Sequence, residues 1–85
     1  MPEISRFYGI IIYMYAKEHN PPHFHFLYGE YNGVMYIKEG IVDGKAPVKI
    51  INKITEWMRI HKDELLKIWE LALSGKSLPR IEPLK

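Results

Sequence analysis

The chain has 85 residues, of which 47% are hydrophobic and 13% aromatic, and its 12 basic and 10 acidic residues give a formal net charge of +2. This length fits one domain, and so weak a charge does not indicate the basic stripe that is typical of strong phosphate binders. Because the chain has no cysteine, disulfides and cysteine-based zinc sites are excluded. A domain this short is marginal alone, so a protein partner or a second copy would be a natural stabiliser.

The sequence shows neither a secretory signal nor a membrane span. Its first residues, MPEISRFYG, place an acid and a serine before any apolar run. The longest apolar run, IIIYMYA, is too short to cross a bilayer. We therefore expect a cytoplasmic protein that does not enter the membrane.

The first half of the chain has strand-like patterns. Residues 9–16, GIIIYMYA, carry apolar side chains at both alternate sets of positions, which predicts a strand covered on both faces or lying near a partner. Residues 17–22, KEHNPP, then form a turn, because proline fixes φ and lacks a donor. Residues 23–28, HFHFLY, alternate as a strand does. With a connection near Gly29 and Glu30, further strands follow in VMYIK (34–38) and IVDG (41–44).

The second half is helical. Pro47 suits a first helical turn, and a second helix is expected to begin near Asp63 and to end before Gly75. Each helix carries an apolar stripe at helical spacing, which places both tryptophans in the core. The stripes are Ile50, Ile51, Ile54, Trp57, Met58 and His61, then Leu65, Ile68, Trp69, Ala72 and Leu73.

Strands followed by helices, without β-α alternation, indicate an α+β fold. We predict a three- to four-stranded antiparallel β-meander followed by a two-helix hairpin packed on one face. The chain forms a single domain over residues 1–85, with strands in 1–45, the helical hairpin in 46–75 and an extended tail in 76–85.

Three of the four histidines lie in EHNPPHFHF, residues 18–26. On a strand, His23 and His25 leave the same face with their Cα atoms roughly 7 Å apart, so both can reach one ion. His19, folded back by the turn, is the nearest third ligand, and Glu18 or Glu30 could supply an oxygen. These residues predict a site for a divalent transition metal such as zinc, with a position left open for hydrolytic chemistry.

Two other interpretations of this stretch stay open. Without a metal, His23 and His25 could act as general base and acid, with Glu18 as a further catalytic residue. Lys17 or Arg6 would then stabilise negative charge on an RNA phosphate. Alternatively, the histidines face solvent on an edge strand and hydrogen-bond backbone carbonyls in the turn.

This stretch, together with residues on either side of it, resembles the sequence of a known family. Pro2, Ile4, Phe7 and Gly9, then the EHNPPHFH core and Trp69, resemble a small prokaryotic family classed as a domain of unknown function, with the signature EHxPPHxH. The resemblance implies no established activity. It implies an arrangement similar to toxin–antitoxin modules, in which a second small protein is encoded beside the first.

We therefore expect a partner-binding component of a toxin–antitoxin-like or regulatory pair, or a homo-oligomer. Its binding surface would include Tyr15, Lys17, Pro21 and Pro22 beside the histidines. The alternative is a small histidine- or metal-dependent hydrolase, with ribonuclease as the expected activity. In that case Glu18, His23 and His25 would be the catalytic residues.

Overall fold

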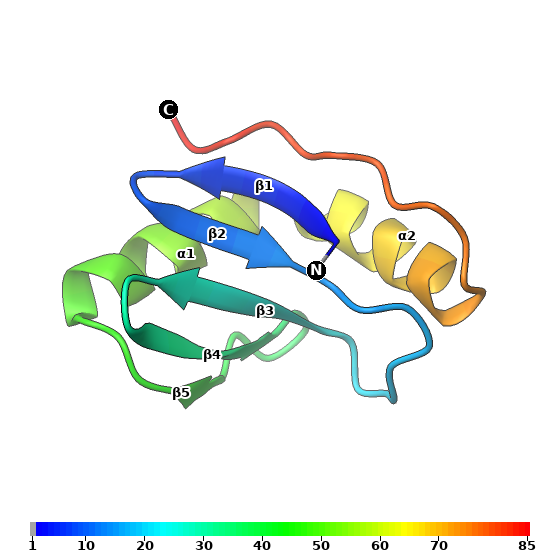
Figure 1. Cartoon of the computed structure of the whole chain (residues 1–85), viewed down its shortest axis with the longest axis horizontal. Helices are drawn as coiled ribbons and strands as arrows, with labels where there is room; N and C mark the ends of the chain where they lie inside the picture. Colours follow the sequence, from blue (N-terminus) through cyan, green and yellow to red (C-terminus); the bar gives the residue numbers. More distant parts are fainter. Residues whose placement is uncertain (1) are drawn as a thin grey trace.

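The computed structural model describes residues 2–85, so Met1, which the predicted strand-rich range includes, lies outside the described residues. One five-stranded antiparallel sheet, in the order β1-β2-β3-β4-β5, is followed by two helices (Figure 1). The predicted α+β class is confirmed, and the predicted count of three to four strands is corrected to five. The elements are β1 (Glu3–Phe7), β2 (Ile10–Tyr13), β3 (His23–Tyr28), β4 (Tyr31–Tyr36), β5 (Val42–Gly44), α1 (Val48–Ile60) and α2 (Lys62–Leu73).

Strand β1 is the element that the sequence patterns did not predict. It pairs with β2, but the register shifts between Glu3 and Ser5. Because of this irregularity, the neighbours Ile4 and Ser5 are both buried, and Phe7 is buried as well. The strand therefore lacks the alternation of apolar and polar residues by which strands are recognised.

The remaining strands lie close to their predicted positions. β3 has the predicted bounds, and Gly29 follows it in the left-handed region with φ of 56°. β2 is shorter than the predicted strand over 9–16, and β4 begins earlier than the predicted strand at 34–38. Glycine adopts positive φ more readily than other residues, which explains why the turn between β3 and β4 could be placed at Gly29 from the sequence.

Both helices pack on one face of the sheet (Figure 1). The core contains the predicted stripe positions Ile50, Ile54, Trp57 and Met58 of α1 and Leu65, Ile68, Trp69 and Ala72 of α2. The Trp57 ring lies 5.3 Å from Phe7 and 5.7 Å from Phe24, between centroids. Both tryptophans are core residues, as predicted.

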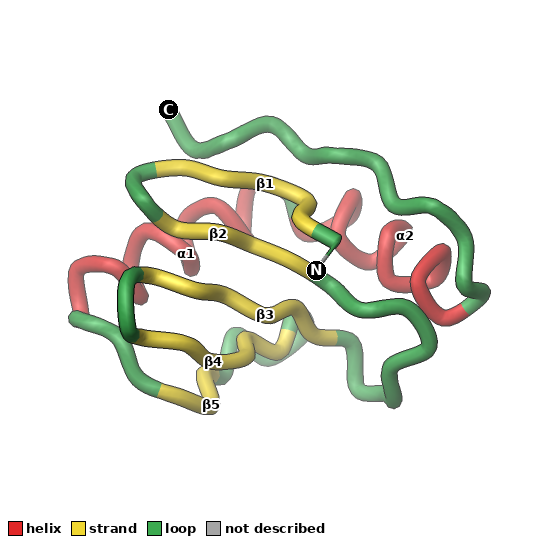
Figure 2. The backbone as a smooth tube through the Cα atoms, in the orientation of Figure 1, coloured by secondary structure: helices red, strands yellow, loops and turns green. Residues whose placement is uncertain are grey.

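Only His61 separates the two helices. That connection is shorter than the two to five residues, roughly, that join a helical hairpin, so the chain bends at His61 and α2 continues along the sheet (Figure 2). The predicted end of α2 is confirmed, because Gly75 follows with φ of 72°. The tail then runs beside β1, where the Ile81 N–H donates to the Ile4 carbonyl at 2.8 Å.

The opposite face of the sheet, which we call the outer face, is covered by neither helix (Figure 1). Strand register places on it side chains that are partly or fully exposed: Arg6, Ile11, Tyr13, His25, Leu27 and Val34. The apolar pattern of residues 9–16, which contain β2, predicted a strand that is covered on both faces or that lies near a partner. The helices of this chain cover only the face that contains Ile10 and Ile12.

Among residues 2–85, neither helix has the length and apolar character that crossing a bilayer requires.

Candidate metal centre

The loop between β2 and β3 is fixed to helix α2 at two points. The Lys17 N–H donates to the Ala72 carbonyl at 2.8 Å, and the Trp69 indole N–H donates to the Asn20 side-chain oxygen at 3.0 Å. Lys17 itself stands in the left-handed region, with φ of 59°. Glu18 lies between these two anchors, so its backbone is held from both sides.

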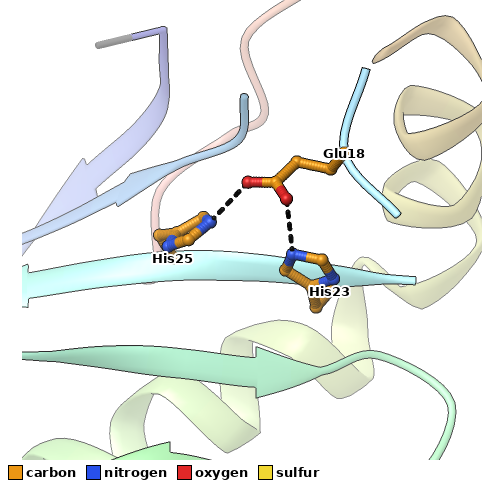
Figure 3. A group of neighbouring side chains, drawn as sticks. All are labelled: Glu18, His23 and His25. Atoms are coloured by element: carbon orange, nitrogen blue, oxygen red, sulfur yellow. Dashed lines mark hydrogen bonds and ion pairs between the residues drawn. The ribbon is translucent and has the colours of Figure 1, made fainter. Parts of the chain in front are cut away.

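From this loop, Glu18 reaches over β3 and presents one carboxylate oxygen to each of two histidines (Figure 3). The His25 Nε2 lies 3.0 Å from Glu18 Oε1, and the His23 Nε2 lies 3.5 Å from Glu18 Oε2. One ligand atom from each of the three residues falls within 4.8 Å of the other two. We call these residues, Glu18, His23 and His25, the triad.

The protonation of the His23 ring follows from its second contact. Its Nδ1 lies 2.8 Å from the Pro21 carbonyl oxygen, which can only accept, so Nδ1 carries the hydrogen. In the neutral imidazole, Nε2 then has a lone pair, and this lone pair faces a carboxylate oxygen. Two acceptors in this position need a cation between them, which is either a proton on the ring or a metal ion.

The distances in the triad fit a metal ion. Zinc binds imidazole nitrogen and carboxylate oxygen at roughly 2.0–2.2 Å, so two ligand atoms on a tetrahedral ion lie about 3.4 Å apart. The two Glu18 contacts, of 3.0 and 3.5 Å, bracket this value, although they end on different carboxylate oxygens and the shorter one is also the length of a hydrogen bond. A backbone carbonyl on the far nitrogen of His23 is also the usual way in which proteins orient a histidine ligand.

Aromatic rings surround the two imidazoles. The Tyr13 ring stacks on His25 at 5.2 Å with 16° between the planes, and Tyr15 meets His25 edge-on at 5.0 Å. The Trp69 ring lies 4.9 Å from His23. Burial, and secondarily the neighbouring Tyr15, raise the pKa of Tyr13. Because the side chains of His23, His25 and Glu18 are 11%, 20% and 24% exposed, the triad opens toward the outer face.

The structure brings together three of the predicted site residues, Glu18, His23 and His25, and leaves the other candidate ligands and cations outside the triad. His19 is exposed and lies outside the triad, and Glu30 lies in the turn beyond the other end of β3. Arg6 is bound to Glu3, with 2.7 Å between guanidinium and carboxylate. The roles of these residues, and of His19 as a ligand, stay predictions.

The residues predicted to form a binding surface differ in exposure. Tyr15, Lys17 and Pro21 are exposed, whereas Pro22 is buried and its carbonyl accepts the Ile37 N–H at 3.0 Å. Their binding role stays a prediction.

Two contributors to the site were not predicted. Asn20 and Trp69 are 49 positions apart in the sequence, and Trp69 was predicted as a core residue and as part of the family resemblance, without a role at the site. Its helical spacing indicates burial but carries no sign of a hydrogen bond to a distant loop. The alternative interpretation had the histidines bonding backbone carbonyls in the turn, and His23 does so with Pro21, but β3 is an inner strand of the sheet and not the edge strand of that interpretation.

Searches of curated proteins and of solved structures return no match. A family described as "Domain of unknown function (DUF4160)" matches residues 9–70, a range that contains the whole triad and most of the sheet and helices. Since this range is more than half of the chain, the protein belongs to the DUF4160 family.

Proposed function

We propose that the triad binds a divalent transition metal and that the protein is a small metal-dependent hydrolase. The observation that carries this proposal is the orientation of His23, whose Nδ1–H is held by the Pro21 carbonyl so that Nε2 faces a carboxylate oxygen of Glu18. Two imidazoles and one carboxylate are a ligand set used by catalytic zinc and by non-haem iron. Three protein ligands leave coordination positions free for water and substrate.

The chemistry follows from this open coordination. Glu18, His23 and His25 would hold the ion, which would supply Lewis-acid chemistry and an activated water for hydrolysis. His25 and Glu18 are the more exposed members of the triad, so a substrate would approach from the outer face. His23 is buried against Trp69 and would serve to fix the ion.

RNA is the substrate class that we propose for this hydrolase. Tyr15 is 42% exposed beside His25, so its ring is available for a base to stack on. Lys17 is also exposed and precedes Glu18 directly, so it can offer a cation to a phosphate. These two residues support RNA over an uncharged substrate.

Cleavage of a single-stranded RNA by metal-stripped protein reloaded with zinc or manganese tests this function. We expect cleavage to depend on the added metal and to fall about 100-fold or more in Glu18→Gln and His23→Ala, which remove ligands. His19→Ala is the matched control, because it removes an exposed imidazole from the same loop. Equal cleavage by wild type and Glu18→Gln, purified identically, would identify a contaminating nuclease and contradict the proposal.

We also propose a second function, binding of a small protein partner as in a toxin–antitoxin-like pair in the cytoplasm. The supporting observation is the outer face, where Ile11, Leu27 and Val34 are only partly buried and no helix of this chain covers them (Figure 1). Tyr15 extends this apolar surface beside the triad.

Co-expression with the product of the adjacent gene tests partner binding. We expect Tyr15→Ser to weaken the purified complex, because it removes an exposed ring from the proposed interface. Tyr8→Ser makes the same chemical change at a residue that is 53% exposed in the β1–β2 turn, and it should leave the complex intact. If both variants bind as the wild type does, the outer face around Tyr15 is not the interface.

A further inference from the structure

We infer that Trp69 is a positioning residue of the metal centre, in addition to its place in the core. The inference rests on the proposed metal site and names a residue that acts on it from another element. Trp69 touches the site in two ways: its ring lies 4.9 Å from the His23 ring, and its indole N–H donates to Asn20 at 3.0 Å. One side chain of α2 therefore contacts both a ligand and the loop that bears another ligand.

Because Trp69 is buried in the core, close packing holds its ring in one position at these two contacts. The residue is 1% exposed, so its ring has no freedom to follow a moving loop. Asn20 is exposed apart from this bond, as expected for a loop residue that is held in place by its partner. The bond fixes the loop two residues after Glu18, while the Lys17 N–H bond to Ala72 fixes it one residue before.

The ring contact acts on His23 from another direction. The Pro21 carbonyl fixes the Nδ1 side of the imidazole, and the Trp69 ring restricts its tilt. Pro21 also follows Asn20 directly, so the indole bond and the carbonyl bond hold adjacent residues of the loop. Supports of this kind orient metal ligands, and losing one typically weakens metal affinity by about 10–100-fold.

The chain supplies a matched control in Trp57. This tryptophan is also fully buried, and its indole N–H also donates a hydrogen bond, in this case to a backbone oxygen, the Glu82 carbonyl at 2.9 Å. Trp57 contacts Phe7, Phe24 and His61, none of which belongs to the triad. Trp57→Phe therefore reports what loss of a buried indole does to the fold alone.

The experiment compares Trp69→Phe, Trp57→Phe and Asn20→Ala with the full-length wild type. The first readout needs no metal: the imidazole nitrogen signals of His23 in NMR spectra should move in Trp69→Phe and stay in place in Trp57→Phe. The second is zinc affinity by calorimetry, which should fall at least tenfold in Trp69→Phe and not in Trp57→Phe. Asn20→Ala leaves the core intact, so it tests the indole bond if Trp69→Phe fails to fold.

A double variant separates positioning from general destabilisation. If the indole acts through Asn20, Trp69→Phe combined with Asn20→Ala should weaken zinc binding no more than Trp69→Phe alone. Unchanged His23 signals and unchanged zinc affinity in Trp69→Phe would overturn the positioning role while leaving the metal site standing. Shifted His23 signals in Trp69→Phe, with no zinc bound by the wild type, would support positioning and overturn the proposed metal function.

Discussion

At the scale of single residues, His23 shows what could and could not be predicted. Alternation in HFHFLY places His23 and His25 on one face of a strand, and the structure confirms that their rings are neighbours, 5.5 Å apart. Glu18 was predicted as an oxygen donor and lies in hydrogen-bonding range of His25. The carbonyl bond that fixes the His23 tautomer depends on the path of the Pro-Pro turn, which residue types alone do not determine.

His19 illustrates the opposite case. It was expected to fold back as a third ligand because it is close in sequence to His23. In the structure it is exposed, while the neighbouring Glu18 is the residue that turns over β3 (Figure 3). Lys17 and Asn20, which flank Glu18 and His19 in the loop, are each bonded to α2.

Tyr13 provides a pH-dependent prediction beside the triad. Burial, and then Tyr15, raise the pKa of its phenol, so the folded protein favours the neutral form. Its contribution to the free energy of unfolding is therefore fully present below the ordinary tyrosine pKa of about 10 and is lost as pH rises through the raised value.

NMR of ring-labelled tyrosine measures this titration directly. The Tyr13 midpoint should lie above that of free tyrosine, and Tyr15→Phe should lower it only in part, because burial is the larger cause. A wild-type midpoint at or below the ordinary value would show that the phenol is fully hydrated.

At the scale of elements, the local signals that proved reliable were turn glycines and helical stripes. Gly29 and Gly75 both adopt positive φ where a turn and a helix end were predicted. Strand β1 escaped prediction because its bulge buries two consecutive residues. The helices were predicted to form a hairpin, with the second beginning near Asp63; in the structure His61 alone joins them and α2 is carried forward along the sheet (Figure 1).

The course of α2 has a consequence for the site. Because the helix continues along the sheet, Trp69 and Ala72 reach the loop that carries Glu18 (Figure 1). Helical periodicity could identify Trp69 as buried but not the loop that it meets, since Asn20 and Trp69 are 49 positions apart in the sequence. The proposed positioning role of Trp69 thus depends on the direction in which α2 runs along the sheet, and the sequence of α2 alone does not reveal that direction.

At the scale of the whole molecule, the two faces of the sheet differ in what covers them (Figure 1). The helices and the tail close the core on one face and along β1, and the other face stays open with the triad at the loop end of β2 and β3 (Figures 1 and 3). Composition predicted an apolar chain suited to a partner, and the open outer face is the surface that such a partner would use. Both proposed functions therefore involve the same side of the molecule.

The central claim is that Glu18, His23 and His25 bind one divalent metal ion. The most direct test is the zinc content per chain of tag-free protein after zinc loading and dialysis, measured by elemental analysis for the wild type, Glu18→Gln, His23→Ala combined with His25→Ala, and His19→Ala. We predict one zinc per chain in the wild type and in His19→Ala, and its loss in the other two. A wild type without zinc, or a Glu18→Gln variant that retains it, would contradict the account.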